Sequence, residues 1–203
     1  MAVDSEAMVA RYRKLETERT AREPGWRKLS AYCLPEHYPL WSSPRRGLLG
    51  GSSGVEYKAW DAIGVECASK LTAAYERLVT PKGRRWHSYE PNDPELRGRA
   101  DVNLWLDDLT QRVFRQRYAS KSGFETAIQA VLQSVAVYGN AAMWVGQRAL
   151  PGGMMQTFFL PLFIRDVLFE VDMFAELTHV YHRFFLTPEE FRHRFPEVRP
   201  PAS

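Results

Sequence analysis

The chain has 203 residues, of which 45% are hydrophobic and 25% are charged, as in an ordinary soluble globular domain. Its 27 Lys and Arg against 24 Asp and Glu leave a net charge of only +3, so bulk charge gives no argument for nucleic-acid binding. The charged N-terminus is not that of a signal peptide, and no run approaches the roughly 20 apolar residues of a membrane helix. Cys33 and Cys67 have no metal-site spacing, so we expect a soluble, cytoplasmically made protein with reduced thiols.

The N-terminal part of the sequence predicts helices followed by a flexible arm. In residues 4–22, apolar residues recur at helical spacing among Arg and Glu, and Pro24-Gly25 should end this helix. A shorter helix should follow and end at Pro35. The Pro-, Gly- and Ser-rich stretch after it predicts a mobile, extended arm, which carries Arg45 and Arg46.

Amphipathic helices are expected to supply the core. Their apolar residues recur at three- and four-residue steps, which places them on one stripe of each helix that should face inward. The expected helices and stripes are 57–78 with Trp60, Ile63, Cys67, Leu71, Tyr75 and Leu78; 101–118 with Val102, Trp105, Leu106, Leu109 and Val113; and 123–138 with Phe124, Ile128, Val131, Leu132 and Val135. Between the first two, Arg85–Tyr89 alternates aromatic and polar residues, which predicts a short strand.

After Asn140 the hydrophobic period changes from helical to alternating, which predicts strands. The expected strands are residues 141–147, 154–164, 167–171 and 177–186. The sequence Thr187-Pro188-Glu189-Glu190 has the pattern of a capping box with proline at the first helical position, so a short helix should follow. Helices, then antiparallel strands, then a final helix predict an α+β fold and not an alternating βαβ chain.

The residue types that most often carry chemistry form no convincing catalytic or metal site. His179 and His182 are three residues apart, so in a strand they point to opposite faces, whereas on a helix they could share a metal. Glu189 and Glu190 are explained by the capping box and the helix macrodipole. The chain has no HExxH, GxSxG or phosphate-loop lysine motif. We therefore expect no catalytic residues, no bound metal and no cofactor.

Two basic clusters are the candidate contact residues. They are Arg45 and Arg46 in the predicted arm, and Lys82, Arg84 and Arg85 in the loop after the first long helix. Short basic loops can contact DNA phosphates without reading sequence. They can equally pair with acidic neighbours such as Glu90, Asp93 and Glu95, or form salt bridges between subunits. The sequence leaves DNA contact and subunit contact open.

Four segments occur in a characteristic order. GWRKLSAYCLP (Gly25–Pro35) carries a W-x-x-L-x-x-Y-x-L-P pattern, and in LVTPKGRRWHSYEP (Leu78–Pro91) a helix should end at Thr-Pro before an aromatic strand. Val102–Val145 contains a W-L-x-x-x-T helix, an S-x-F helix start and a G-x-A-A-M strand start, and His179–Pro196 is similar to a V-Y-R-x-F-x-L-T strand followed by a helix. Together they resemble the N-terminal portion of the head-to-tail connecting (portal) proteins of short-tailed phages.

The chain departs from the family pattern in three local turns and in length. Lys82 stands where the family has the second proline of Thr-Pro-Pro, His87 stands where Phe follows the Trp, and the turn Asp172–Glu176 lacks the usual glycine. Family members continue for several hundred residues. The resemblance therefore implies that this chain holds the outer, wing-like region, without the stem, clip and crown.

The resemblance implies a structural subunit, not an enzyme. Twelve copies would form a ring at one capsid vertex, assembled in the bacterial cytoplasm and retained in the virion. The implied partners are the major capsid and scaffolding proteins, double-stranded DNA bound non-specifically and, through the missing parts, the packaging terminase and the tail; no membrane is involved. The expected segments are N-terminal helices (1–34), a flexible arm (35–55), a helical wing core (56–140), antiparallel strands (141–186) and a short helix with a truncated end (187–203).

Two other functions remain as alternatives from the sequence. The first is a small, non-enzymatic nucleic-acid-binding module, for which the basic clusters are the motivation. The second is an enzyme of unknown class, for which His179, His182, Glu189 and Glu190 would be the only candidate catalytic residues. The order of the four motifs favours the structural subunit over both.

Overall fold

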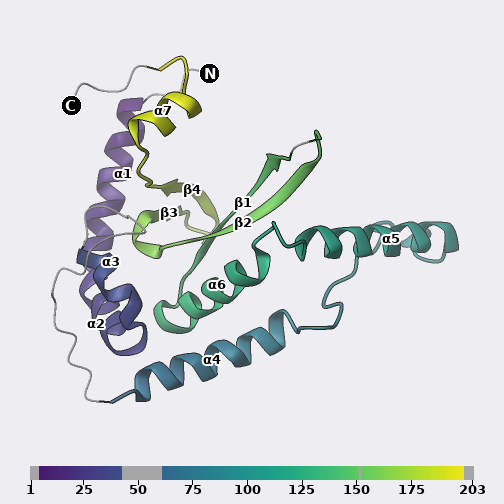
Figure 1. Cartoon of the computed structure of the whole chain (residues 1–203), viewed down its shortest axis with the longest axis horizontal. Helices are drawn as coiled ribbons and strands as arrows, with labels where there is room; N and C mark the ends of the chain where they lie inside the picture. Colours follow the sequence, from purple (N-terminus) through teal and green to yellow (C-terminus); the bar gives the residue numbers. More distant parts are fainter. Residues whose placement is uncertain (1–4, 43–60, 151, 199–203) are drawn as a thin grey trace. The chain divides into compact units, whose positions relative to one another are not determined.

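The computed structural model describes residues 5–42, 61–150 and 152–198 (Figure 1). The chain divides into two compact units. The terminal unit combines both ends of the chain, residues 1–31, 35–58 and 165–203. The central unit comprises residues 59–164 together with the short segment 32–34. Both consist of helices and antiparallel two-stranded sheets, which confirms the predicted α+β fold.

The terminal unit contains helices from the start of the chain and a β-hairpin from its end. Its elements are α1 (Ser5–Thr20), most of α2 (Glu23–Cys33), the 3-10 helix η1 (Pro35–His37), α3 (Tyr38–Ser42), β3 (Val167–Val171), β4 (Leu177–His182) and α7 (Pro188–Arg194). The predicted helices at 4–22 and before Pro35 are confirmed. The segment predicted as an arm begins with helical turns at 35–42, and its residues from 43 onward lie outside the described part of the chain.

The β3–β4 hairpin turns without a glycine. Its register runs from Val167↔His182 to Glu170↔His179, with an irregularity before Val171. In the turn, the Asp172 carboxylate accepts the backbone N–H groups of Phe174 and Glu176, at 2.8 and 2.9 Å. Ala175 takes a left-handed backbone (φ 63°), which a β-carbon makes costly. The aspartate therefore organises a turn that glycine would otherwise favour.

The central unit packs helices against a second antiparallel ribbon. Its elements are α4 (Ile63–Val79), the 3-10 helix η2 (Pro94–Leu96), α5 (Ala100–Arg117), α6 (Phe124–Tyr138), β1 (Ala142–Ala149) and β2 (Met155–Leu162). β1 and β2 pair from Ala142↔Leu162 to Ala149↔Met155. Gly139 ends α6 in the left-handed conformation (φ 75°) expected of a C-cap glycine.

Helix α6 is the centre of the core of the central unit. It contacts α4 on one side and β2 on another, and it buries Phe124, Ala127, Leu132, Val137 and Tyr138. The Phe124 ring meets Phe159 of β2 edge-on, with the ring centroids 5.0 Å apart. The predicted inward stripe of α6 is thus correct for Phe124 and Leu132, while Ile128, Val131 and Val135 are half-buried.

The predicted inward stripe of α4 is wrong for Ile63, Cys67, Leu71 and Leu78, which are exposed, whereas Tyr75 is half-buried. The buried residues of this helix are Ala68 and Thr72, whereas Ile63, Leu71 and Leu78 are 63%, 41% and 80% exposed. The small residues let α4 approach its neighbours closely. A β-carbon on Gly64 would lie 2.5 Å from the backbone carbonyl oxygen of Tyr32, so only glycine fits there. Trp60 lies outside the described residues.

Two further predictions in the central unit are wrong. Trp105 of α5 is 63% exposed, whereas the other residues expected to face inward, Val102, Leu106, Leu109 and Val113, are half-buried. Thr110 is buried and donates its hydroxyl to the Leu106 carbonyl. Arg85–Tyr89 forms no strand and pairs with no described strand. Instead the Tyr89 N–H approaches the Thr110 hydroxyl at 3.4 Å, and the aromatic rings of this segment pack on α5. The segment therefore packs against helix α5, instead of pairing with a strand as its alternating sequence predicted.

The remaining strands and the last helix were predicted correctly. β1, β2 and β3 fall within one or two residues of the expected bounds, and β4 ends at His182, earlier than expected. Thr187 and Glu190 form the predicted capping box of α7. Within 5–42, 61–150 and 152–198, no helix combines the length and the apolarity needed to cross a membrane.

Candidate interaction surfaces

The basic loop Lys82–Arg85 directly follows α4 in the central unit. The Thr80 N–H bonds to the Glu76 carbonyl and closes the helix, and Gly83 takes a left-handed backbone (φ 77°) that turns the chain. The other predicted basic pair, Arg45 and Arg46, lies outside the described residues. Of the candidate contact residues, the structure thus places Lys82, Arg84 and Arg85 together.

Two of these three cations already have partners within the chain. Lys82 pairs with Glu76 at 2.9 Å, and this hydrogen bond raises the pKa of the lysine. Arg85 pairs with Asp107 of α5, and its guanidinium lowers the pKa of that carboxyl. The partners suggested from sequence neighbours were Glu90, Asp93 and Glu95, and for Lys82 and Arg85 this suggestion is wrong. Helix packing brings Glu76 and Asp107 closer.

Arg84 stands beside a cavity of about 480 Å³ and makes no ion pair with any described residue. The cavity is bounded by the basic loop, by α5, which contributes Gln111, Phe114, Arg115 and the adjoining Tyr118, and by the carboxylate-bearing Glu125 of α6. The Phe114 and Tyr118 rings are parallel, with centroids 6.0 Å apart. Among the described residues, Arg115 bonds to Gln111 alone, at 3.4 Å. The cavity therefore combines the aromatic rings of Phe114 and Tyr118 with two cations, Arg84 and Arg115, that form no ion pair with a described residue.

An aromatic stack behind the loop explains its placement. The His87 ring lies parallel to Phe114 at 4.5 Å, and Arg117 lies over the Trp86 ring at 4.8 Å. The Trp86 indole N–H donates to the Tyr118 hydroxyl at 3.1 Å. Burial, and secondarily the charge of Arg117, lowers the pKa of His87, so this ring stays neutral at pH 7. Cation–π and ring contacts hold the loop against α5 and α6.

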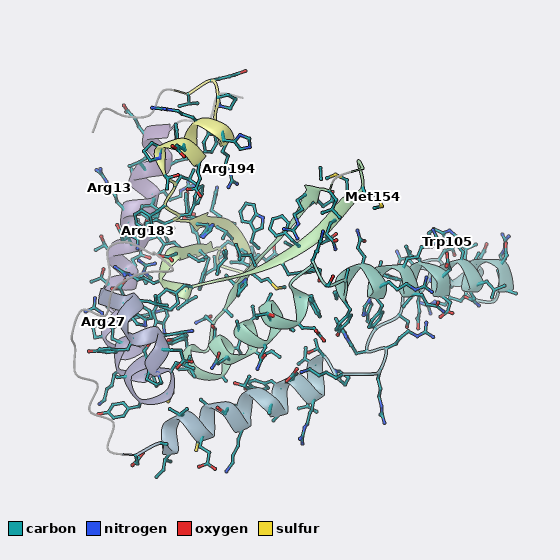
Figure 2. The ribbon with its side chains drawn as sticks, in the orientation of Figure 1. Arg13, Arg27, Trp105, Met154, Arg183 and Arg194 are labelled. Carbon is teal, nitrogen blue, oxygen red and sulfur yellow. The ribbon has the colours of Figure 1, made fainter. Side chains whose placement is uncertain are left out.

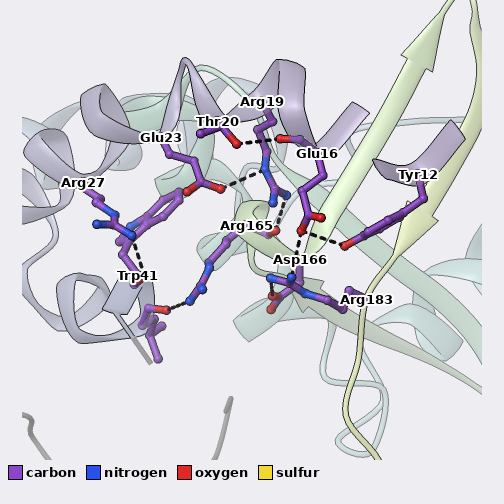
Figure 3. A network of polar contacts seen from close by, with 11 residues as sticks. Tyr12, Glu16, Arg19, Thr20, Glu23, Arg27, Trp41, Arg165, Asp166 and Arg183 are labelled. Carbon is purple, nitrogen blue, oxygen red and sulfur yellow. Dashed lines mark hydrogen bonds and ion pairs between the residues drawn. The ribbon is translucent and has the colours of Figure 1, made fainter. Parts of the chain in front are cut away.

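The terminal unit contains a network of charged side chains (Figure 3). Arg19 is 9% exposed, pairs with Glu23 at 3.2 Å and donates to the Arg165 carbonyl. Arg183 joins Glu16 at 3.2 Å and Asp166 at 3.6 Å. These contacts connect α1 and α2 with the β3–β4 segment, far apart in sequence. The network was not predicted, because its signal lies in tertiary pairing.

The same network extends to α3. Arg165 donates to the Leu40 carbonyl at 2.7 Å, and burial lowers the pKa of this arginine without removing its charge. Arg27 donates to the Trp41 carbonyl at 3.3 Å. The buried Trp41 donates its indole N–H to Ser30 at 2.6 Å. Each of these bonds satisfies a backbone carbonyl or a buried side chain, so the network has a structural role.

The residues considered as candidate catalytic or metal-binding groups do not come together in one site. β4 is a strand, so His179 and His182 project from opposite faces, and His179 lies 3.2 Å from Glu170. Glu190 accepts the Thr187 N–H at 2.8 Å, which lowers the pKa of its carboxyl, and Glu189 lies beside it in the first turn of α7. Across the described ranges, no three His, Cys, Asp or Glu side chains gather as metal ligands would.

Exposed apolar side chains are the feature that the sequence analysis missed. On α4 they are Ile63, Leu71, Leu78 and Val79, and on α5 they are Leu104 and Trp105, the latter labelled in Figure 2. Their helical spacing was visible in the sequence, but it predicted that most of these side chains face the core. Apolar surface of this kind on a folded unit marks a site of contact with other molecules.

An α+β module whose helices carry apolar side chains on their outer faces belongs to the class of proteins that assemble with others. Within this class the chain belongs to the bacteriophage head to tail connecting protein family, whose model matches residues 5–203. No curated protein matches the chain. The chain is therefore a structural connector of phages, which lies in the virion and interacts with head and tail components.

Proposed function

We propose that the chain forms the wing-like part of a portal ring, through which DNA is packaged and to which the tail attaches. The membership in the head to tail connecting family carries this proposal, since it extends over residues 5–203. The exposed apolar faces of α4 and α5 support it, because a subunit that contacts identical neighbours must present apolar surface before assembly.

The proposed ring follows the family pattern. Twelve copies occupy one capsid vertex, the subunits assemble in the bacterial cytoplasm, and they act without catalysis, metal or cofactor. The capsid and scaffolding proteins, the packaging terminase and the tail are the proposed protein partners. Double-stranded DNA passes through the ring and is contacted without sequence recognition.

Mass measurement of the purified chain tests the ring. Light scattering coupled to size exclusion, over a range of protein concentrations and with scaffolding protein added, should detect a closed oligomer of fixed mass. A closed ring gives one mass at high concentration, whereas open polymers give a distribution that grows with concentration. A chain that remains monomeric under all of these conditions would contradict the proposal.

A nucleic-acid-binding module is the second candidate, because Arg84 and Arg115 border an aromatic-floored cavity without ion pairs to described residues. Phosphates would approach these arginines, and binding would weaken steeply with salt. Fluorescence anisotropy with short DNA duplexes at 50 and 200 mM salt should then show a loss in affinity, further weakened by Arg84→Glu. Arg97→Glu, at a position away from the cavity, is the matched control. A salt-independent response would exclude this function.

A further inference from the structure

Helix α4 is apolar on two faces, and the central unit uses only one of them. The buried face is made of small residues, with Gly64, Ala68 and Thr72 turned toward the interior. A neighbouring face, centred about 100° further around the helix axis, carries Ile63, Cys67, Leu71, Ala74 and Leu78, which recur at four- and three-residue steps, and all of them are exposed. We call these five residues the α4 stripe.

A surface helix of a monomeric protein normally has one apolar face and one polar face. The α4 stripe extends over 15 residue steps, about 22 Å at the usual helical rise. Its largest members are more than 40% exposed, and Leu78 is 80% exposed. The stepwise spacing of the stripe suits the ridges and grooves of another helix, so its natural occupant is helical.

The same unit offers a helical surface of a different kind. Leu104 and Trp105, near the start of α5, are 73% and 63% exposed. Tryptophan is one of the residue types enriched among the residues that dominate the binding energy of interfaces. Because these residues are on a different helix from the α4 stripe, two copies can join by unlike surfaces. Repeated contacts between unlike surfaces close into a ring when the rotation between copies allows it.

Charged side chains flank both surfaces. On α4, Lys70 and Arg77 lie along one side of the stripe. Lys70 pairs with Glu66 of the same helix at 2.6 Å, whereas Arg77 makes no ion pair with a described residue and is the cation available to a carboxylate across the contact. On α5, the carboxylates of Asp101 and Asp108 project from the same side as Leu104 and Trp105. These carboxylates are in exposed ion pairs with Arg99 and Arg112, which are weak and can exchange partners at an interface.

We propose that the α4 stripe of one copy docks on the Leu104–Trp105 surface of α5 in the next copy, and that this unlike contact is the repeating joint of the ring. The inference rests on the proposed portal function and adds the surfaces through which the subunits meet. One helix face covers only part of the roughly 800 Å² that each partner buries in a standard interface. The stripe is therefore the apolar centre of a larger contact.

Single substitutions test the two surfaces. Leu71→Asp and Leu78→Asp on the stripe, and Trp105→Asp on α5, place a charge where the proposal puts a dry contact, and each should convert the assembled species to monomer in light scattering. All three positions are exposed, so the monomers should keep the wild-type circular dichroism spectrum. Ser69→Asp adds the same charge to an exposed position of α4 away from the stripe, and it should assemble like the wild type.

A mixing experiment distinguishes unlike from like surfaces. The Leu71→Asp chain keeps an intact α5 surface, and the Trp105→Asp chain keeps an intact stripe, so an equimolar mixture should form a one-to-one dimer that cannot extend. Sedimentation velocity should show this dimer in the mixture and monomer in each variant alone. If like surfaces join, the variant that keeps the joining surface self-associates when alone, and no one-to-one dimer of the two variants forms; that result would overturn the inference.

The outcomes separate this inference from the proposed function. If the wild type forms a ring and both stripe variants still assemble, the ring stands and the assigned surfaces are wrong. If the wild type is monomeric under all assembly conditions, the ring and its joint are both wrong. Loss of assembly by Leu71→Asp and Trp105→Asp, with Ser69→Asp unaffected and the dimer present in the mixture, supports the joint.

Discussion

The two units of this connector protein are stabilised in different ways. The terminal unit connects segments from both ends of the chain through charged and hydrogen-bonded side chains, with Arg19 and Arg183 as its main links. The central unit buries rings and aliphatic side chains around α6, among them Phe124 and Tyr138. Directional bonds thus dominate one unit and apolar packing dominates the other.

This difference has consequences for tolerance to substitution. A packed core loses stability in proportion to the volume removed, and neighbouring side chains relax only in part. A buried ionic network loses stability when one partner is removed, because the charge or carbonyl that remains has no compensating bond. Substitutions in the two units should therefore act locally and through different physical causes, which hydrogen exchange can resolve by segment.

The largest effect is expected from Phe124→Ala in the central unit. Phe124 is 4% exposed, and removing a buried phenylalanine ring costs about 3–5 kcal/mol. Hydrogen exchange should show loss of protection in α4, α6 and β2, while α1 and β3 keep theirs. Phe174→Ala is the matched control, since this ring is 74% exposed and its loss should change little. Equal loss of protection in both units would show that they do not fold independently.

A somewhat smaller effect is expected from Arg19→Ala in the terminal unit. The substitution leaves the Arg165 carbonyl and Glu23 without their buried donor, which should cost about 3 kcal/mol. Protection should fall in α1 and β3 and remain in α6. Arg13→Ala, on the exposed side of the same helix, should be nearly neutral. If Arg19→Ala is as mild as this control, the network does not stabilise the unit.

The smallest effect is a pH dependence that arises at His87. Burial lowers the pKa of this ring below its ordinary value of 6.5, so the unfolded chain binds a proton more readily than the folded chain. The stability of the central unit should therefore be complete above pH 6.5 and decrease as the pH falls toward the lowered pKa. Urea midpoints measured by tryptophan fluorescence at pH 7 and pH 5 would show this decrease.

His87→Phe supplies the control for this effect, because it keeps an aromatic ring on Phe114 and removes the proton site. The variant should lose most of the dependence between pH 7 and pH 5. Carboxylates with lowered pKa, such as Asp107, change their charge only below their ordinary value of 3.8 and do not affect this range. A variant with the same pH dependence as the wild type would show that His87 is not its source.

The candidate site was predictable only in part. The sequence located Lys82, Arg84 and Arg85 in one loop, and the structure confirms that they follow α4 directly. It did not reveal that Glu76 and Asp107 pair with two of them, nor that Arg115 and Phe114 complete the cavity around Arg84. Such partners come from elements that are distant along the chain, and their approach depends on helix packing.

The sequence by itself determined the helices, the antiparallel strands, the capping box of α7 and the family, because these depend on local spacing and motif order. The tertiary structure decided which face of each helix is buried. On α4 both faces are apolar, and the interior selected the small face of Gly64, Ala68 and Thr72 because close packing is possible only there. The larger apolar residues Leu71 and Leu78 remained on the exposed surface of the central unit.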